Sequence, residues 1–339
     1  MSGPATRPGQ SGRDARPPRR PTAPDGLVVV DKPQGWTSHD VVGRMRRLAG
    51  TKKVGHAGTL DPMATGVLVV GVGRATRLLT YVVGAEKEYV TTIRLGVATT
   101  TEDAEGDVTA VTGAEALGPP GAASDAVRAA AGTLTGDLLQ VPSAVSAIKV
   151  DGERAYARVR AGEQVELAAR PVTVSAFEVT GVRPGPAVPA DDGSGATRTT
   201  LDVDARVVCS SGTYVRALGR DLGAALGVGA HLVALRRTRV GGHDLAGAST
   251  LEELEAQADA DGVLATLPLA DAARATFPVR ELDAAETAAL GHGRPLAPAG
   301  EPGTHAAIGP DGTLVALVED APGKGGLLAR PSVVFAAAG

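Results

Sequence analysis

A single carboxylate in a glycine-rich loop is the feature of this sequence best suited to chemistry. Residues 55–68 read GHAGTLDPMATGVL, and Asp61 is the only acid between Asp40 and Glu86. Glycines in the loop let a ligand approach the backbone closely. A lone carboxylate there can attack a substrate or stabilise a cation. An aspartate before a proline also commonly starts a turn, and residue type alone favours that simpler interpretation.

Metal and cofactor chemistry have little support in the sequence. Cys209 is the only cysteine, and the six histidines are scattered without the spacing of a metal motif. Neither GxGxxG nor GxxxxGK[ST] occurs. We therefore expect no metal and no cofactor.

The elements around Asp61 can be placed from hydrophobic patterning. Residues 27–30 and 67–72 are short apolar strands, and residues 87–96, 172–182, 201–209 and 231–240 are typical of longer ones. Thr37 or Ser38 should cap a helix in which Val41, Met45 and Leu48 form the apolar stripe. A helix at 122–132 should pack through Ala126, Val127 and Ala130, Thr213 should cap another that runs to about residue 226, and residues 145–150 should form a strand. This mixture predicts an α+β domain rather than a doubly wound one.

Composition changes divide the chain into four parts. Residues 1–25 hold five arginines and six prolines, which predicts a disordered basic tail. The main domain should span residues 26–250, followed by an Ala-, Asp- and Glu-rich connector over 251–278 and a small β-rich domain over 279–339. No signal peptide and no apolar run long enough to span a bilayer is found, so we expect a cytoplasmic protein without membrane contact.

Positive charge is clustered although the net charge is −4. One cluster contains Arg44, Arg46, Arg47, Lys52 and Lys53, and a second contains six arginines between Arg206 and Arg239 with Asp221 as the only acid. Such clusters can neutralise the phosphates of a nucleic acid, but solvated helix faces and strand edges have the same composition.

Six sequence blocks in order resemble the TruB family of bacterial tRNA pseudouridine synthases, in particular its actinobacterial members. They are LVVVDKPQGWTS from Leu27, the loop GHAGTLDPMATGVL, the segment from Lys87 through TEDAEG, VPSAVSAIK from Val141, CSSGTYVR from Cys209 and GAHLVALRR from Gly229. The resemblance covers about residues 26–250. It implies a mixed, mostly antiparallel sheet in the catalytic domain and a PUA-like, RNA-binding C-terminal domain.

The resemblance also implies a reaction and roles for individual residues. The family isomerises uridine 55 in the T-loop of tRNA to pseudouridine, with an aspartate acting on a flipped-out base. Asp61 would be the catalytic carboxylate, Arg216 its ion-pair partner, and Tyr89 the residue that stacks on the base and transfers a proton. Other matches to substrate contacts are His56, Asp103, Tyr214 and Leu235, and Lys32 and Lys149 are candidates for the RNA backbone. Phosphate contacts would come from Arg44, Arg47, Lys52, Lys53, Arg236 and Arg237.

Three functions remain open at this point. The first is an enzyme that acts on free tRNA as a monomer, without guide RNA or an obligatory protein partner. The second is a tRNA-folding factor that uses the same contacts, and one protein can do both. The third is a guide-dependent catalytic subunit, as in related archaeal and eukaryotic enzymes, which the bacterial-style blocks disfavour.

Overall fold

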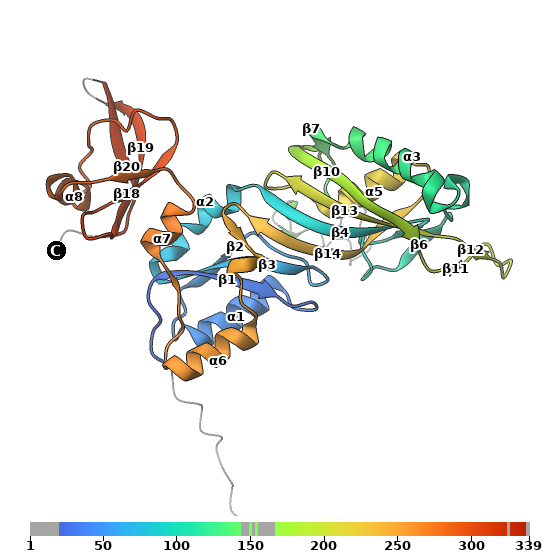
Figure 1. The fold of residues 1–339 in the computed structure, drawn as a ribbon, viewed down its shortest axis with the longest axis horizontal. Coiled ribbons are helices and arrows are strands. Elements are labelled where there is room, and N and C mark those ends of the chain that lie inside the picture. Colours follow the sequence, from blue (N-terminus) through green and yellow to red (C-terminus); the bar gives the residue numbers. More distant parts are fainter. Residues whose placement is uncertain (1–19, 144–148, 151–152, 155–166, 324–325, 337–339) are drawn as a thin grey trace, which may run out of the picture.

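The protein is built on one large mixed sheet with a second, smaller sheet at its C-terminal end (Figure 1). The computed structural model describes residues 20–143, 149–150, 153–154, 167–323 and 326–336 of the chain. The large sheet has the strand order β16 (Leu267–Pro268), β1 (Gly26–Lys32), β3 (Thr65–Val72), β14 (Ala230–Val240), β4 (Lys87–Leu95), β13 (Leu201–Cys209), β10 (Arg170–Pro184) and β7 (Gly136–Gln140), while β2 (Val54–Ala57) pairs with β3 and β15 (His243–Asp244) with β14. Its pairs are antiparallel except for β3 and β14, which run parallel.

Seven α-helices and three short 3-10 helices are found in the described residues. They are α1 (Ser38–Leu48), α2 (Leu79–Gly84), α3 (Pro120–Thr133), α5 (Val215–Ala225), α6 (Leu251–Asp261), α7 (Leu269–Arg274), α8 (Ala284–Gly291), η1 (Gly73–Arg77), η2 (Glu115–Leu117) and η3 (Leu245–Gly247). Within the described ranges no helix is long and apolar enough to cross a membrane.

Alternation along β3 shows how the sheet separates two cores. Leu68 and Val70 belong to a core shared with α1, α3, α5 and α6. Val67 and Val69 face the opposite way, into a core shared with η1, α2, α7 and the C-terminal sheet. Because successive side chains of a strand point to opposite faces, one short strand anchors both cores.

The C-terminal sheet has the order β17 (Val279–Glu281), β18 (Thr304–Ile308), β19 (Leu314–Gly323) and β20 (Gly326–Val334). Figure 1 shows it beside α2 and α7, at the end of the molecule opposite the small hairpin of β11 (Val188–Pro189) and β12 (Thr197–Arg198). Two further pairs, β5 (Val97–Thr99) with β6 (Val108–Val111) and β8 (Lys149–Val150) with β9 (Glu153–Arg154), lie outside the large sheet. The predicted α+β architecture with a small β-rich C-terminal domain is confirmed.

Several local predictions need correction. Thr37 caps α1 through a capping box with Asp40, as expected, but α5 begins one residue later than predicted, with Tyr214 rather than Thr213 at its N-cap. Ala126 is exposed, and α3 packs through Ala123 and Ala131 as well as the predicted valine and alanine.

The two ends of the predicted main domain also differ from expectation. Ala23, predicted to lie in the tail over residues 1–25, is buried, and its N–H donates to the Ala49 carbonyl, so the end of that segment packs on the main domain; residues 1–19 lie outside the described part. Residues predicted as a connector contribute α6 to the first core and β16 to the large sheet. Of the predicted strand over 145–150, only β8 is described.

Candidate active site

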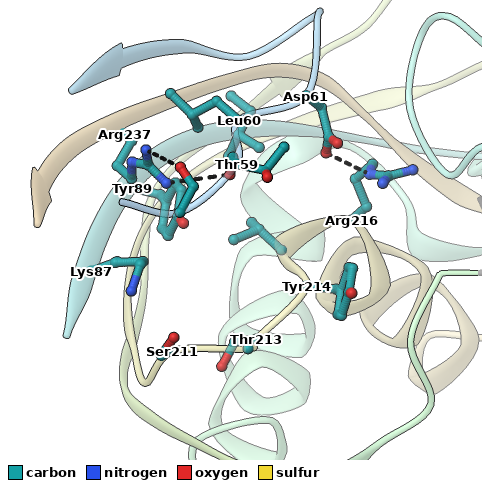
Figure 2. A pocket seen from close by; sticks show the side chains of 14 residues that line it. Thr59, Leu60, Asp61, Lys87, Tyr89, Ser211, Thr213, Tyr214, Arg216 and Arg237 are labelled. Carbon is teal, nitrogen blue, oxygen red and sulfur yellow. Dashed lines mark hydrogen bonds and ion pairs between the residues drawn. The ribbon is translucent and has the colours of Figure 1, made fainter. Parts of the chain in front are cut away.

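A pocket of about 220 Å³ opens beside the Asp61 loop, between the large sheet and the N-terminal end of α5 (Figure 2). Four separate stretches of the chain line it: residues 58–61, residues 87 and 89 of β4, residues 211–216, and residues 235 and 237 of β14. The sheet order places β4 next to β14, and the loop before β3 meets them because β3 also pairs with β14.

Asp61 and Arg216 form an ion pair at one side of this pocket. The Arg216 Nε lies 3.0 Å from Asp61 Oδ2. The arginine side chain is 5% exposed whereas the aspartate is 37% exposed, so the carboxylate faces the cavity and the cation lies behind it. A charge-assisted hydrogen bond from a buried guanidinium fixes the carboxylate in place.

The rest of the Arg216 guanidinium is held by three further groups. Its Nη1 donates to the Thr101 carbonyl at 2.8 Å and to Ser143 Oγ at 3.2 Å, and it lies 3.6 Å from Asp103 Oδ2. Asp103 is buried, and its other oxygen accepts hydrogen bonds from Thr101 Oγ1 and from the Glu105 N–H. The Asp103 carboxylate thus faces the guanidinium in this structure, and its contact with the substrate nucleotide remains a prediction.

The Arg237 side chain binds backbone carbonyls of the loop that contains Asp61 and of the strand that follows it. This side chain is fully buried; its Nε donates to the Val67 carbonyl at 2.7 Å and its Nη2 to the Gly58 carbonyl at 3.1 Å. A longer bond from Nη1 reaches the Thr59 carbonyl at 3.4 Å. In this structure its donors are directed to backbone carbonyls of the protein, and a phosphate contact by Arg237 remains a prediction.

Lys32 holds the other side of the same loop. It is fully buried, and its Nζ donates to the Trp36 carbonyl at 2.6 Å, the Pro33 carbonyl at 3.0 Å and the Pro62 carbonyl at 3.4 Å. Burial lowers the pKa of Lys32 to about 8. In this structure the Lys32 ammonium donates to three protein carbonyls, and its contact with the RNA backbone remains a prediction.

Tyr89 and Leu235 form the apolar wall of the pocket. Both are buried, and they project from adjacent strands, because Tyr89 of β4 is paired with Arg237 of β14, two residues after Leu235. Burial raises the pKa of Tyr89, which keeps its phenol protonated. A planar ring and an aliphatic side chain make a suitable surface for a nucleobase.

Tyr214 lies across the cavity from Tyr89, below Arg216 in Figure 2. It is the N-cap residue of α5, so its position follows from where that helix begins. The structure thus brings six of the predicted residues to one pocket: Asp61, Tyr89, Tyr214, Arg216, Leu235 and Arg237.

His56 does not line this pocket. It lies in β2, and its ring meets that of His39 edge-on with centroids 5.9 Å apart. Burial lowers the pKa of His56, which favours the neutral imidazole, and its Nδ1 has no hydrogen-bond partner in the described part of the chain. Contact between His56 and RNA remains a prediction.

The predicted phosphate contacts divide into two groups. Arg44 is paired with Glu255 of α6, and Arg236 forms a two-point ion pair with Asp31 at 3.0 and 2.6 Å. Arg47, Lys52 and Lys53, by contrast, are exposed near α1. The side chain of Lys149 lies outside the described residues.

Lys87 lines the pocket and was not predicted. Its Nζ donates to the carbonyls of Ala85 at 2.7 Å and Val83 at 2.9 Å, and burial lowers the pKa of Lys87 to about 8. The two-residue period of a strand places Lys87 on the same face as Tyr89, a signal that was available in the sequence.

Chemically, the site offers an oriented carboxylate, a neutral phenol and a nucleobase-sized cavity. Within the described residues no group of three or more His, Cys, Asp or Glu side chains is arranged to hold a metal ion. The arrangement suits covalent or ion-pair catalysis by the carboxylate on a planar substrate.

Comparison with protein families gives matches along most of the chain. Residues 46–215 match the N-terminal domain of TruB family pseudouridylate synthases. Residues 216–269 match the tRNA pseudouridylate synthase B C-terminal domain, and residues 277–336 match the C-terminal region described for tRNA pseudouridine synthase II.

Individual relatives agree with the family models. The chain is 57% identical to tRNA pseudouridine synthase B of Arthrobacter sp. over 92% of its length and 96% of the relative. It is 55% identical to the Thermobifida fusca protein of that name, covering 92% of this chain and 99% of the relative.

Solved structures show the same fold. A chain in the crystal structure of a Cbf5–Nop10–Gar1 complex superposes with a TM-score of 0.65 at 27% identity, covering 92% of this chain and 85% of that one. A chain in an H/ACA RNP bound to a substrate RNA containing 2'-deoxyuridine superposes with a TM-score of 0.63 at 26% identity, covering 91% and 84%. By domain matches and by sequence identity over nearly its whole length, the chain belongs to the TruB family of pseudouridylate synthases.

Proposed function

We propose that this protein converts uridine 55 in the T-loop of tRNA to pseudouridine, with Asp61 as the catalytic carboxylate. The observation that carries the proposal is the ion pair in which buried Arg216 presents Asp61 to a pocket walled by Tyr89 and Leu235. The relatives described above are named as tRNA pseudouridine synthases, which supports tRNA as the substrate.

The reaction is balanced without an external group. The bond between ribose C1′ and uracil N1 breaks, the ring turns, a bond forms between C1′ and C5, the C5 proton leaves and N1 gains a proton. A base inside a folded loop must first be flipped into the pocket, at a cost of a few kcal/mol. Stacking against Tyr89 and contact with Leu235 offset part of that cost.

Asp61 has two chemical options in this scheme. Its carboxylate can add to the uracil ring or to C1′, and either route needs an ionised, fixed oxygen next to the bound nucleotide. The hydrogen bond from the Arg216 guanidinium would hold the carboxylate in place for either route. The protonated Tyr89 phenol is suited to proton transfer at the ring edge.

Exposed basic side chains would hold the RNA backbone. Arg47, Lys52 and Lys53 are the exposed phosphate candidates, and the C-terminal domain is proposed as a further RNA contact. We propose that the enzyme acts on free tRNA without a guide RNA, because its bacterial relatives match over nearly their whole length.

The proposal is tested with an unmodified tRNA transcript and the purified protein alone. Mass spectrometric mapping should place pseudouridine at position 55. Asp61→Asn should abolish product, because the amide keeps the shape but loses the nucleophilic charge, while still binding the transcript. Product at another position, a requirement for an added guide RNA, or full activity of Asp61→Asn would contradict the proposal.

A further inference from the structure

A buried glutamine amide holds the backbone of Tyr214. Gln140 is the last residue of β7 and is 3% exposed. Its Nε2 donates to the Tyr214 carbonyl at 3.1 Å, and its Oε1 accepts from the Tyr214 N–H at 2.8 Å. One side chain therefore binds both polar backbone groups of one residue, which fixes that peptide in distance and in rotation.

This contact lies where α5 needs external partners. The first N–H groups of a helix have no partner within the helix, and Tyr214, the N-cap of α5, makes no capping bond through its side chain. Gln140 satisfies the N-cap N–H from the edge strand of the large sheet. The direction in which α5 begins is thus tied to the end of β7.

The residues after Gln140 hold the next positions of the helix. The Val141 carbonyl accepts from Arg220 Nη2 at 2.9 Å. Ser143, which is fully buried, accepts from Arg216 Nη1 at 3.2 Å. The short stretch 140–143 therefore contacts the N-cap, the second residue and the sixth residue of the helix that supplies Arg216 to the pocket.

A small displacement of the first turn of α5 would move a side chain that binds the catalytic carboxylate. Asp61 is bound by Arg216 through Nε at 3.0 Å, and Tyr214 lines the cavity from the same turn. A rotation of the Tyr214 peptide would carry both side chains with it. Displacement of a catalytic group by about 1 Å can cost on the order of a hundredfold in rate.

We propose that Gln140 is a positioning residue: its amide sets the orientation of Tyr214 and, through the first turn of α5, of Arg216 against Asp61. The role rests on the proposed function, since it assigns Gln140 to the same reaction. Gln140 does not line the pocket, so it acts through the residues that do.

The decisive variant is Gln140→Glu, read as a function of pH. A protonated glutamic acid has one donor and one acceptor, as the amide does here, whereas the ionised form has no donor for the Tyr214 carbonyl. At pH 8 we expect kcat to fall roughly tenfold or more with KM for tRNA within about twofold of wild type. Toward pH 5, kcat relative to wild type should recover, because burial raises the pKa of the new carboxyl group.

Two further variants separate positioning from stability. Gln140→Met has neither donor nor acceptor, so its low kcat relative to wild type should not change with pH. Gln257, which is half-buried on α6 away from the pocket, is a control with similar backbone bonds: its Nε2 donates to the Val263 carbonyl at 3.1 Å and to Asp261 Oδ2 at 2.7 Å, and its Oε1 accepts from the Ala265 N–H at 2.9 Å. Gln257→Glu should lower the melting temperature but leave kcat unchanged at every pH.

A spectroscopic measurement tests the contact without using activity. The chain has four tyrosines, so protein labelled with 15N-tyrosine gives few amide signals, and Tyr214→Phe identifies the one of interest. In Gln140→Glu this signal should shift with pH and return toward its wild-type position in acid. In wild type it should stay constant.

The outcomes distinguish the two proposals. Wild-type kcat in Gln140→Glu and Gln140→Met, or a loss confined to KM or melting temperature, would overturn the positioning role while leaving the proposed function intact. A Tyr214 amide signal that is the same in Gln140→Glu and wild type at every pH would also overturn the positioning role. Wild-type protein that forms no pseudouridine in tRNA would overturn the proposed function and this role together.

Discussion

Arg216 is the residue on which the charges of the site depend. Its guanidinium lies between the half-exposed carboxylate of Asp61 and the buried carboxylate of Asp103. Two anions at these distances would otherwise repel each other in a region with little water to screen them. The arginine therefore orients one carboxylate and neutralises the other.

We expect Arg216→Met to destabilise the protein by about 3 kcal/mol, because it leaves Asp103 buried without a cation. Urea unfolding of variant and wild type measures this loss. The double variant Arg216→Met/Asp103→Asn should regain part of the stability, since the orphaned charge is gone, but should stay inactive. Equal stability of Arg216→Met and wild type would show that the pair contributes nothing.

Lys87 should give the folded state an unusual dependence on pH. Burial lowers its pKa to about 8 in the folded protein, whereas an unfolded lysine titrates near 10.4. Between these values the unfolded state binds more protons, so this residue's contribution to the free energy of unfolding rises with pH.

We therefore expect the difference in unfolding free energy between wild type and Lys87→Met to grow in favour of wild type from pH 8 to pH 10. This difference should rise by at most about 1.4 kcal/mol per pH unit. Urea titrations at several pH values measure it. A difference that shrinks over this interval would contradict a buried, low-pKa ammonium.

Some residue roles followed from the sequence and others did not. Asp61, Tyr89 and Arg216 were predicted from matching blocks, and the structure places them together. The sequence predicts Lys32 as an RNA contact from its place in a matching block and Arg237 from its place in a basic cluster, but the structure shows both side chains buried. Burial of a cation among backbone carbonyls depends on tertiary contacts that composition and spacing do not encode.

At the scale of elements, the parallel pair β3–β14 brings the Asp61 loop to the pocket. Gly66 is paired with Arg237 at a positive φ of 99°, and a Cβ at Gly66 would lie 2.2 Å from the Arg237 carbonyl oxygen. The glycine was predicted to admit a ligand. In the structure, its missing side chain allows β14 to approach β3 closely, and this brings the Arg237 side chain within reach of the loop carbonyls.

We expect Arg237→Met to lower stability and kcat without changing the salt dependence of tRNA binding, because its donors serve the loop rather than phosphates. The control is Arg47→Met on α1, which should reduce the slope of log K against log salt by about 1. Binding titrations at several salt concentrations compare the two. A reduced slope for Arg237→Met would instead support the predicted contact between Arg237 and a phosphate.

Element boundaries were predictable where local chemistry sets them. The capping box at Thr37 and the apolar stripe of α1 are both encoded within a few residues. The start of α5 is different, since its N-cap N–H is satisfied by Gln140, 74 positions earlier in the sequence. A cap supplied from so far away leaves no local signal, so residue type indicates Thr213 although the N-cap is Tyr214.

At the scale of the whole molecule, the two sheets share one core. Phe335, Ile308 and Leu314 of the C-terminal domain pack with Val67 and Val69 of β3. Arg77 adds a bond to the Val334 carbonyl at 2.8 Å. The change in sequence pattern near residue 279 predicted a second domain, but alternation shows only that a strand face is buried, not which part of the chain covers it.

Because the core is shared, we expect a destabilising substitution in the C-terminal domain to lower the stability of the catalytic domain as well. Phe335→Ala should cost about 3 kcal/mol, and Trp36, the only tryptophan, reports on the first core. Its fluorescence midpoint in urea should fall together with the midpoint from circular dichroism. Leu327→Ala, at a side chain 56% exposed, is the control and should change neither. An unchanged Trp36 midpoint in Phe335→Ala would show that the two domains unfold independently.

The position of Phe335 also bears on how the protein is made. Arg74 binds the Phe335 carbonyl at 2.6 Å across 261 positions of sequence, and the Phe335 ring completes a core begun by strands near residue 70. A ribosome produces the chain from its N-terminus, so the part of this core that the C-terminal sheet covers stays open until residues 304–335 have been made, whereas η1 and α2 can already pack on β3. During that interval apolar side chains of β3 and α2 are exposed, so we expect the nascent chain to bind chaperones.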